Sequence, residues 1–208
     1  MKFSKEFKEA ISHLPSIEKD KLLYRLLKKD ILLAKRLEFE LLSDANVEDK
    51  RAEMQQHISE EVQRMTKGFY STGYLNMDIR YLSGSITEYV KVTKDKFGEV
   101  SLNIQLLTEV LQQNREHILN ASFGRASKLL VAIIARAFKI LLLSDKLHED
   151  LLFDLKEDSK QLGLLIGDND YLMRTAIFHG FDVNWLISGS PADIQKIYKD
   201  LRDRGYLR

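Results

Sequence analysis

Apolar residues recur at helical spacing along most of the chain. The clearest case lies near the C-terminus, where an apolar stripe of Ile194, Ile197, Tyr198 and Leu201 follows Pro191 and ends before Gly205. Proline in the first turn and glycine after the last turn mark the two ends of a helix. The same spacing predicts helices at about residues 3–13, 16–29, 31–43, 46–68, 101–119, 124–145, 147–163, 169–179 and 191–204.

The segment at about 124–145 is apolar around nearly its whole circumference. A helix of this kind is buried at the centre of a fold. We therefore predict an all-α protein, an irregular bundle of eight to ten helices around this central apolar helix.

The region between residues 69 and 105 is ambiguous. Phe69 to Asn76 is aromatic and contains a glycine, which is typical of a loop. Beyond Gly84, the apolar positions fit a helix, which we favour because the flanking segments are helical. A small hairpin near 88–105 is the alternative, because residues 90–92 alternate and 94–98 suit a turn.

Composition indicates a folded domain of ordinary character. Apolar residues make up 44% and charged residues 30%, with a net charge of +1 and no cysteine. We expect one domain over 1–208, with 1–43 as a candidate subdomain of short helices and no recognisable internal repeat. No apolar stretch is long enough to span a bilayer and Met1 opens no secretion signal, so we expect a cytoplasmic protein without membrane contact.

The predicted central helix carries a basic stripe that contains Arg125, Lys128, Arg136 and Lys139. Acidic residues follow in the next predicted helix. The interpretation that we favour is that the two helices neutralise each other, with Arg136 paired to an acid from 149–158. The alternative is an anion-binding groove for phosphate or a nucleotide, since arginine suits phosphate geometry.

Metal and catalytic motifs are weak in this sequence. Asp154-x-x-Glu157 resembles half of the magnesium site of helical nucleotide pyrophosphohydrolases, but no second E-x-x-D set accompanies it. The histidines are scattered, and no phosphate-binding loop or nucleophile elbow is present. We therefore expect no cofactor, no metal site and no catalytic residue, and keep a magnesium-dependent nucleotide hydrolase as an alternative function.

Residues Leu14 to Asp30, with Leu37 to Leu42, resemble the N-terminus of a family of hypothetical bacterial all-helical proteins. The similarity extends toward Lys94 to Gly98. Some members of that family carry a dUTP-hydrolase label. The resemblance implies an all-helical class, whereas the carboxylate motifs that such an activity needs are absent here.

A second resemblance concerns Asp182 to Gly189, which are similar to the segment that closes some repressor-type helix-turn-helix domains. DNA binding through the C-terminal helices is therefore another alternative. The last helix mixes its basic residues with Asp193, Asp200 and Asp203, which phosphate would repel. We accordingly do not expect a nucleic-acid partner.

The N-terminal helices carry more leucines than three short helices can bury among themselves. Some of these side chains must then meet the rest of the bundle or another chain. We predict an interaction surface around Leu23, Leu27 and Phe39. The function that we favour is that of a non-enzymatic protein-interaction or regulatory protein, with a protein partner or self-association.

Overall fold

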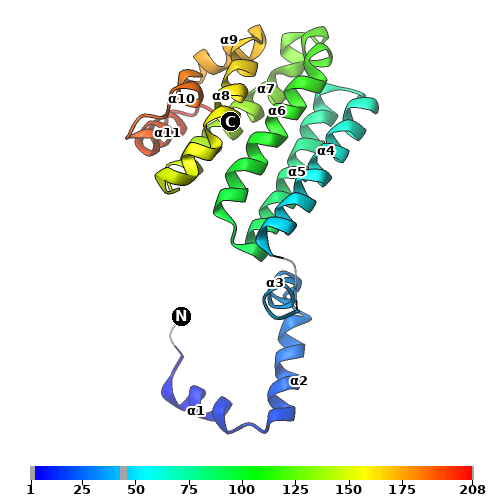
Figure 1. Cartoon of the computed structure of the whole chain (residues 1–208), viewed down its shortest axis with the longest axis vertical. Helices are drawn as coiled ribbons and strands as arrows, with labels where there is room; N and C mark the ends of the chain where they lie inside the picture. The colour runs from blue at the N-terminus through cyan, green and yellow to red at the C-terminus, as the bar shows by residue number, and fades with distance from the viewer. Residues whose placement is uncertain (1–2, 43–45, 208) are drawn as a thin grey trace. The chain divides into compact units, whose positions relative to one another are not determined.

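The computed structural model describes residues 3–42 and 46–207. Within these residues every regular element is a helix, which confirms the predicted all-α class. The helices are α1 (Lys5–His13), α2 (Ser16–Leu27), α3 (Ile31–Leu42), α4 (Val47–Lys67), α5 (Thr72–Thr93), α6 (Lys96–Asn120), α7 (Phe123–Ser144), α8 (Glu149–Gly167), α9 (Asp170–Phe178), α10 (Asn184–Ile187) and α11 (Ile194–Asp203) (Figure 1).

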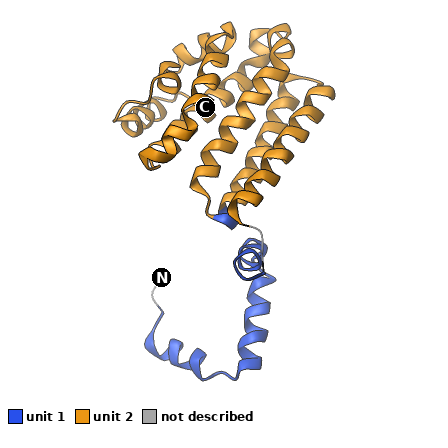
Figure 2. Ribbon diagram, viewed as in Figure 1, with its two compact units in different colours: residues 1–44, 91–93 blue, residues 45–90, 94–208 orange. Residues whose placement is uncertain are grey.

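The chain forms two compact units, shown in Figure 2. Unit 1 comprises residues 1–44 and 91–93, and unit 2 comprises residues 45–90 and 94–208. The division falls close to residue 43, the end of the subdomain considered from the sequence, although residue 43 itself lies outside the described residues.

Unit 2 is built from antiparallel helices in two layers. Helices α4, α6 and α8 follow one another in one layer, and α7 packs against α6, α9 and α11 (Figure 1). Short connections join successive helices, and the main packing contacts run between α4 and α6, between α6 and α8, and between α6 and α7. Helix α5 lies beside α7, since Thr72 and Ser83 of α5 both contribute hydrogen bonds with α7 residues.

The core of unit 2 centres on α6 and α7. These two helices contribute most of the fully buried aliphatic side chains, as expected for apolar helices at the middle of a bundle. Phe138 of α7 is fully buried, and its ring contacts the rings of Phe181, Trp185 and Tyr198. The C-terminal helices are thereby attached to the central helix that the sequence predicts.

Gly163 explains why α8 and α10 pack closely. A Cβ atom at this position would lie 2.7 Å from Cγ1 of Ile187 and 3.1 Å from Cβ of Leu186. Real Cβ atoms do not approach carbon this closely, so only glycine permits the observed packing.

The region left ambiguous by the sequence is helical. The hairpin considered near 88–105 is wrong, because α5 continues to Thr93 and α6 begins at Lys96. Lys94 separates the two helices with a left-handed backbone (φ 61°), and Asp95 caps α6. The predicted loop at 69–76 is too long, since α5 already begins at Thr72 with Ser71 as its cap. The last helix begins at Ile194, three residues after Pro191.

Unit 1 contains α1, α2 and α3. Each helix has ordinary helical signals, such as Ser4, whose side chain accepts a hydrogen bond from the Phe7 amide at the start of α1. None of the described residues of these three helices is buried. Unit 1 therefore forms helices without a hydrophobic core of its own.

Candidate functional site

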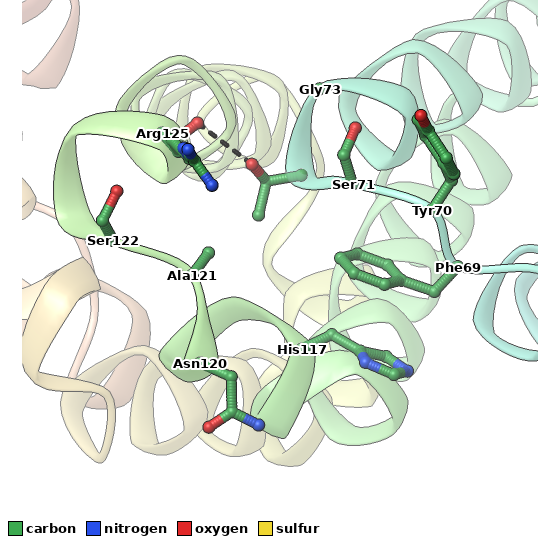
Figure 3. A pocket seen from close by; sticks show the side chains of 10 residues that line it. Phe69, Tyr70, Ser71, Gly73, His117, Asn120, Ala121, Ser122 and Arg125 are labelled. Carbon is green, nitrogen blue, oxygen red and sulfur yellow. Dashed lines mark hydrogen bonds between the residues drawn. The ribbon is translucent and has the colours of Figure 1, made fainter.

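A pocket of about 470 Å³ lies where the α4–α5 connection meets the α6–α7 connection in unit 2. Figure 3 shows the lining side chains arranged around an open space. The volume is within the range of about 300–1,000 Å³ that is typical of small-molecule sites. The lining residues are Phe69, Tyr70, Ser71, Thr72, Gly73, His117, Asn120, Ala121, Ser122 and Arg125.

Two helices begin at this pocket with the same local sequence pattern. Serine stands at the N-cap and glycine two residues later, in Ser71-Thr72-Gly73 of α5 and Ser122-Phe123-Gly124 of α7. The Ser71 hydroxyl accepts a hydrogen bond from the Tyr74 amide (3.3 Å), whereas the Ser122 side chain makes no capping bond. The amides of the first turn of α7 therefore remain available to a ligand, and the positive end of the helix dipole favours an anion.

The two helix starts are held together by a direct bond. The buried hydroxyl of Thr72 donates to the backbone carbonyl of Arg125 (3.0 Å), drawn as a dashed line in Figure 3. A Cβ atom at Gly124 would meet nothing within 4 Å. The start of α7 is therefore fixed in place and open to approach.

Arg125 supplies the positive charge of the pocket. Its exposed guanidinium makes no ion pair with a described residue, and the described lining contains no carboxylate. His117 stands on the opposite side, with its ring stacked on Phe69 at 4.2 Å between centroids. The pocket thus offers several hydrogen-bond donors: the Arg125 guanidinium, the hydroxyl groups of Ser71 and Ser122, and the backbone amides at the start of α7. Such a set of donors suits an anion such as phosphate.

The remaining residues of the basic stripe have different surroundings. Lys139 pairs with Glu99 of α6 (3.4 Å between Nζ and Oε1). Lys128 is exposed outside the pocket. Arg136 donates a hydrogen bond to the Ser83 hydroxyl of α5. The structure thus brings only Arg125 of this stripe to the pocket.

The predicted pairing of Arg136 with an acid from 149–158 is wrong. The acids of α8 that contact basic side chains among the described residues do so locally: Glu157 pairs with Lys160, and Asp150 lies 3.2 Å from Nδ1 of His148. Helix α8 packs beside α6, and the basic side of α7 at Arg136 faces α5 instead. Burial, together with the neighbouring cation Arg80, lowers the pKa of Arg136 to about 10. Arg136 is still charged at neutral pH.

Other candidate sites of the sequence lie elsewhere. Among the described residues, His, Asp and Glu side chains form no cluster of three or more that could hold a metal ion. In the C-terminal helix, Arg204 pairs with Asp200 (2.9 Å). The Asp182 carboxylate accepts hydrogen bonds from Asn184 at the start of α10.

The predicted N-terminal surface residues lie on the helices of unit 1. The side chain of Leu23 in α2 is 46% exposed. Leu27 of α2 and Phe39 of α3 are half-buried. All three belong to a larger set of apolar side chains that unit 1 leaves partly or fully uncovered.

Of the pocket residues, only Arg125 was among the site residues predicted from the sequence. The serine–glycine pattern at residues 71–73 and 122–124 is the signal that could have found the rest, since serine caps a helix and glycine leaves its first turn open. His117 carries no such signal, because only the fold brings it to the two helix starts.

Comparison with known proteins found no match among protein-family models, curated proteins or solved structures. None of the described helices combines the length and apolar character that crossing a membrane requires. Function must therefore be inferred from the two units themselves.

Proposed function

We propose that this is a non-enzymatic interaction protein that associates with another protein chain through the apolar faces of α1, α2 and α3. The observation that carries the proposal is the absence of any buried side chain among the described residues of these helices. Amphipathic helices gain most of their stability by burying an apolar face. A second surface is therefore needed to stabilise unit 1.

Helix α1 presents the simplest case. Phe3 directly precedes the Ser4 cap of α1, and Phe7 and Ile11 lie four residues apart on one side of the helix. Their exposed fractions are 56%, 51% and 37%, and the rings of Phe3 and Phe7 contact each other at 5.5 Å. An apolar stripe of this length on a soluble helix is typical of a docking face.

Helices α2 and α3 continue the same pattern with exposed aliphatic side chains. Those more than 40% exposed are Ile17, Leu23, Leu26, Ile31, Leu33, Leu41 and Leu42. At about 25 cal/mol per Å² of apolar surface, covering even part of this set contributes several kcal/mol. That contribution is large beside the total stability of a domain, about 5–15 kcal/mol.

The charges of α1–α3 favour a protein over a lipid surface. Helices that bind membranes carry mainly lysine and arginine on the polar face. Here acids and bases alternate, as in Lys5–Glu9 of α1 and Arg36–Glu40 of α3, which form ion pairs within their own helices. A face of mixed charge is also complementary to itself, so a second copy of the chain is the partner that we propose first.

Light scattering after size exclusion tests this proposal on the full chain over a dilution series. We expect a dimer or larger assembly that dissociates on dilution, and a shift to monomer in Leu23→Glu combined with Phe7→Glu. Leu164→Glu is the matched control, because Leu164 is a comparably exposed leucine (54%) on α8. A monomer at all concentrations, or equal effects of the double substitution and of Leu164→Glu, would reject self-association.

A second function is supported by the pocket at the starts of α5 and α7. We propose that it binds a phosphate group of a small ligand. The supporting observation is the exposed guanidinium of Arg125 beside an uncapped helix start, with no acid in the described lining. Because a ligand that binds only the native state raises stability, pyrophosphate at 100 times its Kd should add about 2.7 kcal/mol.

Thermal denaturation with and without pyrophosphate, in the presence of chelator, tests the phosphate site. We expect stabilisation of the wild type and its loss in Arg125→Ala. Lys128→Ala is the control, since it removes one cation from the same helix outside the pocket. Equal stabilisation of all three proteins would assign the effect to general anion binding and refute the site.

A further inference from the structure

A polar groove of about 260 Å³ lies in unit 2 on the layer formed by α4, α6 and α8. It is separate from the pocket at the starts of α5 and α7, since the two share no lining residue. The lining residues are Gln55, Ser101, Ile104, Gln105, Thr108, Glu109, Gln112, Asp158 and Gln161. Nearly all of these side chains are polar, and none is basic.

Glu109 and Gln105 of α6 are held rigidly at the groove by Ser59 of α4. The Ser59 hydroxyl donates to Oε1 of Glu109 (2.7 Å). The Gln105 amide Nε2 donates to the same carboxylate oxygen (2.8 Å) and to the Ser59 hydroxyl oxygen (3.2 Å). The Gln105 amide also donates to the backbone carbonyl of Gln55 in α4 (3.0 Å). The donors of this network are thus directed at Oε1 of Glu109 and at α4, and none is directed at Oε2 of Glu109.

Three buried polar atoms at the groove have no hydrogen-bond partner among the described residues. They are Oε1 of Gln105, Oγ1 of Thr108 and Oε2 of Glu109, all on residues that line the groove. The three residues lie at i, i+3 and i+4 on one face of α6, so a ligand that brings several hydrogen-bond donors complements them.

The charge of the groove selects the kind of donor. Glu109 and Asp158 are its two charged residues, and both are acidic. Asp158 is exposed on α8 and forms no ion pair with a described residue, and Asp154 lies one turn earlier on the same helix. A cation with several N–H groups complements this arrangement in both charge and hydrogen bonding.

We propose that this groove binds an arginine side chain of a partner polypeptide. The guanidinium group carries five donors in a planar fork and no acceptor, which matches a site made of acceptor oxygens. The volume lies below the range of about 300–1,000 Å³ for whole small-molecule ligands, and so fits a single side chain. This inference does not depend on the α1–α3 surface or on the phosphate pocket.

An NMR titration of the full chain with a short glycine–serine peptide that carries one central arginine tests the proposal. We expect saturable shifts of the side-chain amide signals of Gln105 and its groove neighbours. The same peptide with citrulline, which has the arginine shape without the charge, should bind about ten-fold more weakly or not at all. Equal shifts with citrulline or lysine, or no saturable shift with arginine, would overturn the proposal.

Variants localise the binding. Asp158→Asn changes an exposed side chain and should lower the affinity for the arginine peptide about ten-fold without affecting the fold. Glu109→Gln should lower this affinity further, because the substitution removes the negative charge of the carboxylate that carries Oε2. Asp203→Asn on α11 is the matched charge control and should bind as the wild type. If Asp158→Asn also binds as the wild type, the groove is not the site.

Discussion

The hydroxyl of Thr72, in the first turn of α5, donates to the backbone carbonyl of Arg125, in the first turn of α7, at 3.0 Å. The bond joins residues that lie 53 positions apart in the chain. It holds together the two helix starts that form the pocket in Figure 3. The geometry of the proposed phosphate site therefore depends on Thr72, which lines the pocket and also joins the two helix starts.

Replacing Thr72 with valine should lower the free energy of unfolding by about 1 kcal/mol, the usual contribution of one hydrogen bond. Thr72→Ser should recover most of that loss, because it keeps the donor. Chemical denaturation measures both variants. If valine is as stable as threonine, the bond does not hold the helix starts together.

Asp95 should be the charged residue whose loss destabilises unit 2 most. Its buried carboxylate accepts hydrogen bonds from Nε of Arg51 (2.7 Å), the Tyr89 hydroxyl (2.7 Å) and the Gly98 amide (2.8 Å). Breaking a buried pair of this kind costs about 3–5 kcal/mol, so we expect a loss of this size in Asp95→Ala. Glu53→Gln, which breaks the exposed pair with Lys50, should cost less than about 1 kcal/mol.

The effect of Asp95 should disappear in acid. Burial alone would raise the pKa of Asp95, but hydrogen bonds from Arg51, Gly98 and Tyr89 outweigh it and hold the pKa below its usual range. A depressed carboxyl pKa stabilises the fold above the unfolded value of about 4, and the stabilisation is lost as pH falls through the folded value. Urea denaturation of the wild type and Asp95→Asn at pH 7 and pH 3 should show a difference that shrinks at pH 3.

His179 should make the C-terminal segment sensitive to mild acid. Its buried ring accepts a hydrogen bond at Nδ1 from the Leu207 amide (3.1 Å), which requires the neutral form. Burial lowers the pKa of His179. The stabilisation by neutral His179 is therefore complete above the unfolded-state pKa of about 6.5. It is lost as pH falls through the lower pKa of His179 in the folded state.

Stability curves between pH 7.5 and pH 5 check the role of His179. The wild type should lose more stability over this range than His179→Asn, which keeps a hydrogen-bond acceptor that does not titrate. His57→Asn, at an exposed position, should follow the wild type. Parallel curves for the wild type and His179→Asn would exclude the proposed titration.

Replacing Arg136 with methionine should leave stability unchanged or raise it by about 1 kcal/mol. The guanidinium is largely buried near the cation Arg80, and its Nε atom has no hydrogen-bond partner among the described residues. An apolar side chain of similar length avoids both the desolvation and the repulsion. Thermal denaturation decides the sign, and a loss of several kcal/mol would show that the Ser83 bond outweighs both costs.

The sequence predicted elements well where a single physical effect dominates. Helix α7 (Phe123–Ser144) agrees within one residue at each end with the predicted 124–145. A segment that is apolar around nearly its whole circumference indicates a buried helix, so the prediction rested on one strong signal. The start of α5 was missed because Gly73 and the aromatic residues around it are also typical of loops. The Ser71 hydroxyl, which accepts a hydrogen bond from the Tyr74 amide, caps α5 so that the helix begins at Thr72.

Predictions that depend on which helices are neighbours were less successful. The acids of α8 follow the basic stripe of α7 in the sequence, so pairing was expected. The layered arrangement places α8 beside α6 and turns Arg136 toward Ser83 of α5. Charge patterns along a chain do not by themselves determine which helices become neighbours. Likewise, His117 reaches the pocket only through the antiparallel order of α4 to α7.

Hydrogen exchange at several protein concentrations tests the central claim, that α1–α3 are covered by another chain. The amides of α6 and α7, in the core of unit 2, should exchange slowly at every concentration and serve as an internal reference. We predict that the amides of α1–α3 exchange rapidly in dilute protein and become protected as the concentration rises. Protection that is already complete in the most dilute sample, or rapid exchange at every concentration, would contradict the account.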